Sequence, residues 1–68
     1  MLKKMRYVYT VYEEKSFSKA AERLFVSQPS LSAMVKKVES DYGITIFDRT
    51  TTPVSLTPEG EYYIHTAK

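Results

Sequence analysis

Hydrogen-bond donors and cations follow one another closely in the middle of the chain: Ser27, Gln28, Ser30, Ser32, Lys36 and Lys37. Amide and hydroxyl groups bond to base edges and to phosphate oxygens, and lysines neutralise phosphate charge. No dense run of acidic residues interrupts this set. The chemistry it predicts is contact with a polyanion.

Residues for catalysis or for holding a metal are scarce. The chain has no cysteine, so a disulfide or a thiolate metal site is excluded, and a single histidine argues against a zinc site. That histidine, His65, has no partner at the spacing of a nucleophile–base pair. We expect no catalytic residue, no metal site, no cofactor and no enzyme activity.

The distribution of charge favours a polyanionic partner more than its sum does. The 68 residues suffice for one small domain, and their net charge is only +2. Up to Lys37, eight basic residues face three acidic ones, whereas the remainder is acidic by comparison. This asymmetry predicts that the first half of the chain makes the polyanion contact.

The donors lie in a stretch, Ala20–Ser32, that is typical of two short helices joined by a tight turn. Ser27 is a good N-cap, and Pro29 fits the first turn, where a missing N–H costs little. The turn is Phe25-Val26, without the glycine that such turns often hold. The pattern predicts a helix-turn-helix, whose second helix enters the DNA major groove.

Two helices are expected to precede the turn. Apolar residues at helical spacing predict the first over residues 2–14. We interpret the charged side chains on its other face as solvent-exposed, in preference to a phosphate contact. The segment Lys15–Ser18 ends it, and Phe17 there is expected to enter the core. Ser18 is expected to cap a second helix over Lys19–Leu24, in which Ala20 and Ala21 allow close packing.

The third helix is expected from Gln28 to Tyr42, with Gly43 as its C-terminal cap. One stripe at helical spacing is expected to face the core, formed by Leu31, Val35, Val38 and Tyr42. The opposite face carries the polar side chains.

Two short strands and a last helix are expected after Gly43. The strands are Ile44–Phe47 and Val54–Leu56, and the polar loop between them would make a wing. Arg49 is the wing's cation, expected to reach phosphate or an adjacent minor groove; alternatively it pairs with Asp48 or another nearby acid. Thr57-Pro58-Glu59 starts the last helix, whose apolar surface needs the first helix or a second copy of the chain as partner.

The N-terminal cluster of Lys3, Lys4 and Arg6 is not followed by an apolar segment, so it is not a signal peptide, and no apolar run approaches membrane-spanning length. We expect a cytoplasmic protein without a membrane partner.

Several segments, in unbroken order, resemble the N-terminal domain of LysR-type transcriptional regulators. They are Ser16–Leu24, Val26–Ser32, Val38-Glu39, Phe47–Arg49 and Leu56–Gly60. The resemblance implies a mainly α fold, a winged helix-turn-helix with a three-helix core and a short two-stranded wing, over residues 1–57. Residues 58–68 would begin a linker helix, and the C-terminal effector-binding domain of the family would be absent.

The resemblance also implies double-stranded DNA as partner and a homodimer through the linker helix, which assembles further into a tetramer in the full-length protein. It implies a small-molecule effector only through the missing domain. Gln28, Pro29 and Ser32 match DNA-contacting positions, Ser27 matches the cap, and Arg49 matches the wing arginine. The full expected contact set is Ser27, Gln28, Pro29, Ser30, Ser32, Ala33, Lys36, Lys37, Arg49 and Thr50.

Four positions depart from the family pattern. Ala33 and Met34 stand where longer polar residues are common, which shifts the weight of DNA contact toward Gln28, Lys36 and Lys37. Thr52 stands where the wing often has a second basic residue, and Lys15 replaces a common glycine at the end of the first helix.

Two alternatives stay open. In a protein-interaction or dimerisation module, the basic face would be merely solvated and the last helix would be the working surface. In another winged-helix regulator family, the dimer geometry would change while the DNA role would remain.

Overall fold

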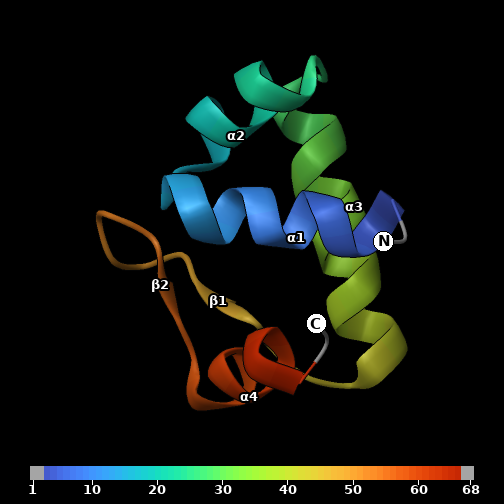
Figure 1. The fold of residues 1–68 in the computed structure, drawn as a ribbon, viewed down its shortest axis with the longest axis vertical. Coiled ribbons are helices and arrows are strands. Elements are labelled where there is room, and N and C mark those ends of the chain that lie inside the picture. Colours follow the sequence, from blue (N-terminus) through green and yellow to red (C-terminus); the bar gives the residue numbers. More distant parts are fainter. Residues whose placement is uncertain (1–2, 67–68) are drawn as a thin grey trace.

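The computed structural model describes residues 3–66, which form four helices and a two-stranded antiparallel sheet (Figure 1). The helices are α1 (Lys3–Glu14), α2 (Phe17–Leu24), α3 (Gln28–Tyr42) and α4 (Pro58–Thr66). The strands are β1 (Phe47–Asp48) and β2 (Ser55–Leu56), with Phe47 opposite Leu56. The mainly α, winged helix-turn-helix fold expected from the sequence is confirmed.

Helix α1 crosses in front of α3 in Figure 1, while α2 lies above it, and the wing and α4 lie below. Val8 and Val11 of α1, Ala20 of α2, and Leu31 and Val35 of α3 are completely buried at this crossing. The small side chains of Ala20 and Ala21 let α2 pack closely, as expected. Phe17 enters the same core, and Tyr7 and Tyr9 pack against it.

Helix α2 begins earlier than the sequence pattern suggested, and its cap was assigned to the wrong serine. Ser16 has extended backbone and its hydroxyl accepts the Lys19 N–H at 3.2 Å, so Ser16 is the N-cap. Ser18 lies within the helix instead, and its hydroxyl donates to the side chain of Gln28.

Helix α3 has the expected bounds, because the signals at both ends are strong. Ser27 caps its N-terminus, and Gly43 ends it in the left-handed conformation, with φ of 66°. Leu31, Val35 and Val38 are buried as predicted, but Tyr42 was wrongly placed in the core. It is 63% exposed and its ring meets the ring of Tyr63 edge to face.

The strands are shorter than expected, because backbone N–H groups at the predicted start of β1 are hydrogen bonded to α3. The Ile44 N–H donates to the Glu39 carbonyl at 3.0 Å, which completes the helix end. The Ile46 and Phe47 N–H groups donate to the Glu39 carboxylate at 2.7 and 3.2 Å. Pairing with β2 therefore begins only at Phe47.

Two non-glycine residues have left-handed backbone. Lys15, with φ of 55°, ends α1, and Phe25, with φ of 58°, ends α2. The Lys15 carbonyl accepts the Val54 N–H at 3.1 Å, so this strained turn also anchors the wing.

Helix α4 begins at Pro58 as expected and packs back onto the domain. Tyr63 and Ile64 are buried, and the Tyr9 hydroxyl of α1 donates to the Ile64 carbonyl. The expected partnership with the first helix is thus present, while Tyr62 remains 74% exposed. Residues 2, 67 and 68, which the sequence pattern assigned to helices, lie outside the described residues.

Candidate nucleic-acid interface

The N-terminus of α3 is open to solvent. Ser27, Gln28, Pro29 and Ser30 are all exposed, and no acidic residue lies in the first turn. Free backbone N–H groups and the helix dipole give such an end a partial positive charge. An external anion can therefore approach it without displacing any acid of the helix itself.

Ser27 is used within the helix, which leaves Ser30 as the outward donor. The Ser27 hydroxyl accepts the Ser30 N–H at 3.2 Å and donates to the Ser30 hydroxyl at 2.8 Å. A serine hydroxyl has one hydrogen, so that of Ser27 is consumed by this contact. The hydrogen of Ser30 is free for a ligand.

Gln28 is tied to the start of α2 by one bond, because its side-chain oxygen accepts from the Ser18 hydroxyl at 3.3 Å. This contact fixes one edge of the carboxamide, while the remaining lone pair and both N–H groups are left for a base. Sequence reasoning missed this role of Ser18, since nothing in the local pattern of the first turn of α2 indicates a bond to Gln28.

Arg49 does not project from the tip of the wing. Its guanidinium donates to the Ser32 hydroxyl at 2.6 Å, lies 3.6 Å from a Glu39 carboxylate oxygen, and sits 4.4 Å from the centre of the Phe17 ring. The alternative that it pairs with a nearby acid is realised, though with Glu39 and not with Asp48. These contacts join the wing to α3 and α2.

Glu39 is the residue of this region that sequence reasoning did not assign to the site. Its side chain is only 14% exposed, accepts hydrogen bonds from two amides and forms an ion pair with one guanidinium at 3.6 Å. The available signal was its position: an acid near the C-terminal end of a helix is disfavoured by the helix dipole, so it needs partners elsewhere.

The wing turn is held by Asp48 and Thr50. The Thr50 hydroxyl and N–H both donate to one Asp48 carboxylate oxygen, at 2.5 and 2.9 Å. These bonds, the hydroxyl first, lower the pKa of Asp48. Thr50 is exposed, but its hydroxyl hydrogen is directed to Asp48.

A polar hollow of about 330 Å³ lies between the starts of α2 and α3 and the wing. Its lining includes Ser16, Ser18, Gln28, Ser32, Arg49 and Thr51. Three of the predicted contact residues, Gln28, Ser32 and Arg49, therefore come together around one concave surface. The wing and the front of α3 form its two sides.

The predicted contact residues further along α3 differ in exposure and in whether an acidic side chain already pairs with them. Lys37 lies 3.8 Å from Asp41, which also pairs with Lys4 of α1 at 3.7 Å, whereas Lys36 is exposed and in no ion pair among residues 3–66. Ala33 is exposed but brings only a methyl group, and Met34 is half-buried.

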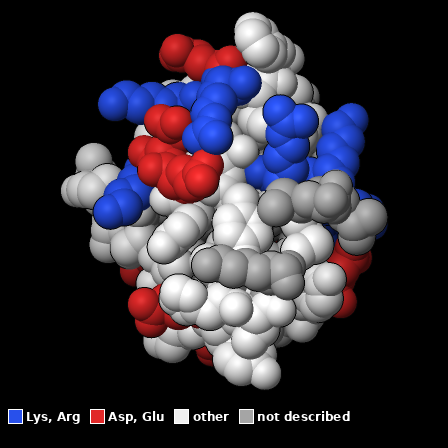
Figure 2. Space-filling model, viewed as in Figure 1, with Lys and Arg blue, Asp and Glu red and all other residues white. Residues whose placement is uncertain are grey.

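The excess of basic residues in the first half is partly neutralised in the fold. Figure 2 shows lysines and arginines over the upper half of the molecule, where α1 and α2 lie, with acidic side chains among them. Arg23 contacts Glu13 at 2.9 Å and Glu14 at 3.2 Å, and these hydrogen bonds, Glu13 first, raise the pKa of Arg23. The charge of Arg23 is thus paired with two acidic residues of α1.

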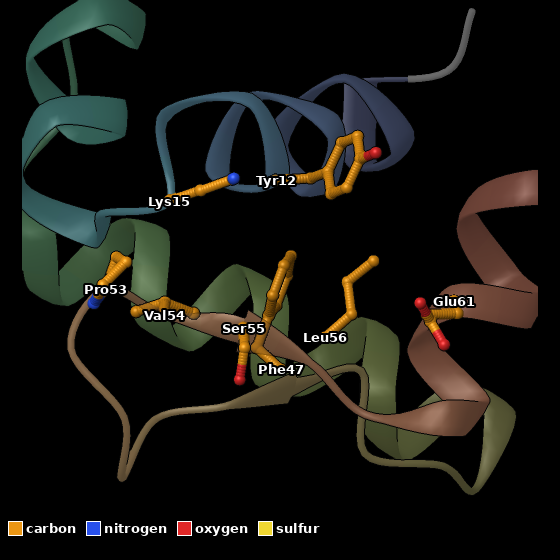
Figure 3. A pocket seen from close by; sticks show the side chains of 8 residues that line it. All are labelled: Tyr12, Lys15, Phe47, Pro53, Val54, Ser55, Leu56 and Glu61. Carbon is orange, nitrogen blue, oxygen red and sulfur yellow. The ribbon is translucent and has the colours of Figure 1, made fainter.

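A second pocket lies on another side of the wing, between α1 and α4 (Figure 3). Tyr12 enters it from α1 and Lys15 from the turn after α1. Phe47 and Leu56 enter from the wing, and Glu61 from α4. None of the ten predicted contact residues lines it, although Lys15, Pro53 and Val54 line both this pocket and the polar hollow.

Over residues 3–66 the structure shows no cluster of three or more histidine, cysteine, aspartate or glutamate side chains placed to hold a metal ion. No helix within that part of the chain has the length and hydropathy needed to cross a membrane.

Comparison with known proteins agrees with this architecture. Residues 2–61 match the family described as bacterial regulatory helix-turn-helix protein, lysR family. The uncharacterized HTH-type transcriptional regulator YcgK of Bacillus subtilis (strain 168) is 43% identical over 67 residues, which are 98% of this chain and 21% of YcgK. The HTH-type transcriptional regulator BenM of Acinetobacter baylyi is 42% identical over 62 residues, which are 91% of this chain and 20% of BenM.

Solved structures show the same fold. The BenM DNA-binding domain in complex with catB site 1 DNA has a TM-score of 0.92 and 40% identity, over 98% of this chain and 72% of that one. Vibrio fischeri DarR in complex with DNA has a TM-score of 0.91 and 33% identity, over 94% of this chain and 22% of that one. The chain spans about one fifth of the length of the curated relatives it matches. It belongs to the lysR family of bacterial regulatory helix-turn-helix proteins, as a winged DNA-binding domain and not an enzyme.

Proposed function

We propose that this domain binds double-stranded DNA sequence-specifically as part of a transcriptional regulator, with α3 in the major groove and the wing against the adjacent backbone or minor groove. The observation that carries the proposal is the open N-terminus of α3, exposed, free of acidic residues and flanked by the wing across a polar hollow. The complexes of the related BenM domain with DNA support it.

Each predicted contact residue has a role that its surroundings allow. Gln28 reads base edges, adenine above all through a bidentate pair, and Pro29 and Ala33 make apolar contacts beside it. Ser30 and Ser32 donate to phosphate oxygens, and Ser27 presents the helix end. Thr50 lies against the DNA backbone without donating to it, because its hydroxyl and its N–H are both bonded to Asp48. Lys36 and Lys37 neutralise phosphates. Arg49 belongs to the set through the contacts it makes behind Ser32.

The assembly follows from α4. We place the domain boundary at Pro58, where α4 starts the linker helix through which two copies pair; tetramers would form in the full-length protein. A small-molecule effector would act through the region that the relatives have beyond this domain. The exposed Tyr62 ring on α4 and the cytoplasmic location of a DNA-binding regulator fit this arrangement.

The test is a fluorescence-anisotropy titration against a pool of random duplex DNA at two or more salt concentrations. We expect affinity to fall steeply with salt, and Lys36→Ala to reduce the slope of log affinity against log salt by about one. Lys37→Ala should reduce it less, because Asp41 already shares that charge. Lys3→Ala is the matched control: it removes the same charge from α1, where the ammonium lies over the Tyr7 ring.

Selection from the same pool tests sequence readout. Gln28→Ala should relax the selected sequence, whereas Lys36→Ala should weaken binding to all sequences alike. A folded protein without salt-dependent binding, also when two copies are tethered, would contradict the proposal and favour a protein-interaction module that works through α4.

A further inference from the structure

Arg49 can carry out its part in DNA binding without touching DNA. Its side chain is 29% exposed, and the three groups around its guanidinium come from three elements: Ser32 and Glu39 of α3, and Phe17 of α2. Arginine is suited to such a place, since its planar guanidinium bonds in fixed directions and stacks on an aromatic ring at the same time.

The bond to Ser32 has a known direction. An arginine has only donors, so in the 2.6 Å contact the Ser32 oxygen must be the acceptor. The hydrogen of the Ser32 hydroxyl is therefore not used by Arg49. The adjacent positive charge also opposes a second donor approaching the same oxygen, so Ser32 faces its ligand as a donor.

Glu39 holds Arg49 in place through an ion pair. One carboxylate oxygen accepts from the Ile46 and Phe47 amides at 2.7 and 3.2 Å, and the other lies 3.6 Å from the guanidinium. The carboxylate thus holds the first residues of the wing and the arginine of the wing on the same helix that carries Ser32. A shift of the wing would move Arg49 away from the Ser32 hydroxyl.

Building on the proposed DNA-binding function, we propose that Arg49 is a positioning residue that acts through Ser32: braced by Glu39 and the Phe17 ring, it orients the Ser32 hydroxyl as a hydrogen-bond donor toward acceptor atoms of DNA. Such acceptors are phosphate oxygens and, among base edges in the major groove, O6 and N7 of guanine, N7 of adenine and O4 of thymine.

A double-mutant cycle on DNA affinity separates this role from a direct phosphate contact. Arg49→Met keeps an unbranched side chain against Phe17 but removes the guanidinium, and Ser32→Ala removes the hydroxyl. We expect Arg49→Met to weaken binding about tenfold in the wild-type background and less than about twofold in the Ser32→Ala background. The salt slope should stay the same, since in this role the guanidinium itself neutralises no phosphate and the Ser32 hydroxyl is uncharged.

Ser30 provides the matched control. It lies two residues before Ser32 in the first turn of α3 and is hydrogen bonded to Ser27, not to Arg49. Arg49→Met should therefore lose the full tenfold in a Ser30→Ala background. Arg49→Lys should behave like Arg49→Met, because an ammonium keeps the charge but lacks the two-armed geometry; for a phosphate contact it would largely preserve affinity.

Folding is controlled with a second variant. Removal of Arg49 leaves the Glu39 carboxylate without its cation, so the cycle is repeated with Glu39→Gln, whose oxygen still accepts the Ile46 and Phe47 amides. Loss of affinity that is equal in the wild-type and Ser32→Ala backgrounds, or a salt slope reduced by about one, would overturn the positioning role alone. Absence of any salt-dependent binding by the wild type would overturn the DNA-binding function and this role with it.

Discussion

The N-termini of α3 and α4 begin with similar residue types but have opposite surroundings. Ser27 and Thr57 each accept the N–H three residues on, and each is closely followed by proline. At α3 the first turn is exposed and free of acids, whereas at α4 it contains Glu59 and Glu61 and rests on the chain before β1. A cap signature therefore sets where a helix starts, and the neighbouring contacts decide whether that start is available to a ligand.

Thr57 shows how the α4 end is closed. Its N–H donates to the Ile46 carbonyl at 3.0 Å, and its hydroxyl donates to the Thr45 carbonyl. Gly60 is buried, and a Cβ at this position would lie 2.0 Å from the Ile46 carbonyl oxygen. Within residues 3–66 the Ser27 side chain bonds only to Ser30, so of these two helix ends it is the α3 end that is open to an external group.

The largest effect is expected where α4 meets backbone. Gly60→Ala should lower the free energy of unfolding by about 3 kcal/mol or more, because the new methyl group would overlap the Ile46 carbonyl, which cannot move aside as a flexible side chain would. Urea denaturation measures this. Gly43→Ala is the control: it meets no atom within 4 Å and should cost only about 1 kcal/mol for its left-handed backbone.

Next in size is a substitution that gives α3 the acidic first turn of α4. Ser30→Glu should weaken DNA binding at least about 100-fold, since a carboxylate would face the phosphates. The same variant should stabilise the fold by about 0.5 kcal/mol through the helix dipole and a capping box with Ser27. Glu59→Gln should leave DNA affinity unchanged; parallel loss of affinity and stability in Ser30→Glu would contradict the comparison.

A smaller difference separates the two caps themselves. Thr57→Val should cost about 2 kcal/mol of stability and Ser27→Ala about 1 kcal/mol, because Thr57 also bonds carbonyls before β1 while Ser27 bonds only within its own helix. Thermal unfolding of both variants checks the order. Equal losses would show that the additional bonds of Thr57 contribute little.

The smallest expected effect lies in the wing turn, where Asp48 accepts an amide two residues on, much as a cap does. Its pKa is lowered by Thr50, so the stabilisation is fully present above the unfolded pKa and is lost as pH falls through the folded pKa. Thr50→Val should raise the pKa of Asp48 toward its ordinary value in an NMR titration. Thr51→Val should not, because the Thr51 hydroxyl bonds backbone carbonyls and Ser55.

Local signals made much of the fold predictable. Serine, proline and glycine at the two ends of α3 fixed its bounds, and Thr57 with Pro58 fixed the start of α4. The errors arose where distant groups competed with local ones. Ser16, and not Ser18, is the N-cap of α2. The Glu39 carboxylate accepts the Ile46 and Phe47 N–H groups, which an earlier start of β1 would have needed for strand pairing.

The candidate site was predictable as a set of residue types but not as a set of contacts. The spacing along α3 identified the exposed polar face, because helical geometry alone decides it. The inward-facing position of Arg49 depends on Ser32, 17 residues earlier, and on Glu39. Pairings between elements of this kind follow from tertiary packing, which the local pattern does not contain.

The Tyr9–Ile64 bond bears on the order in which the domain assembles. Its two ends are 55 residues apart in the chain. The bond from the Ser30 N–H to Ser27 and the bonds from the Ile46 and Phe47 amides to Glu39 join residues only three to eight apart. Short loops close at lower entropic cost than long ones. We therefore expect the helix-turn-helix and the start of the wing at Ile46 and Phe47 to form early in folding. Helix α4 should pack onto the domain last and should detach from it first in local unfolding.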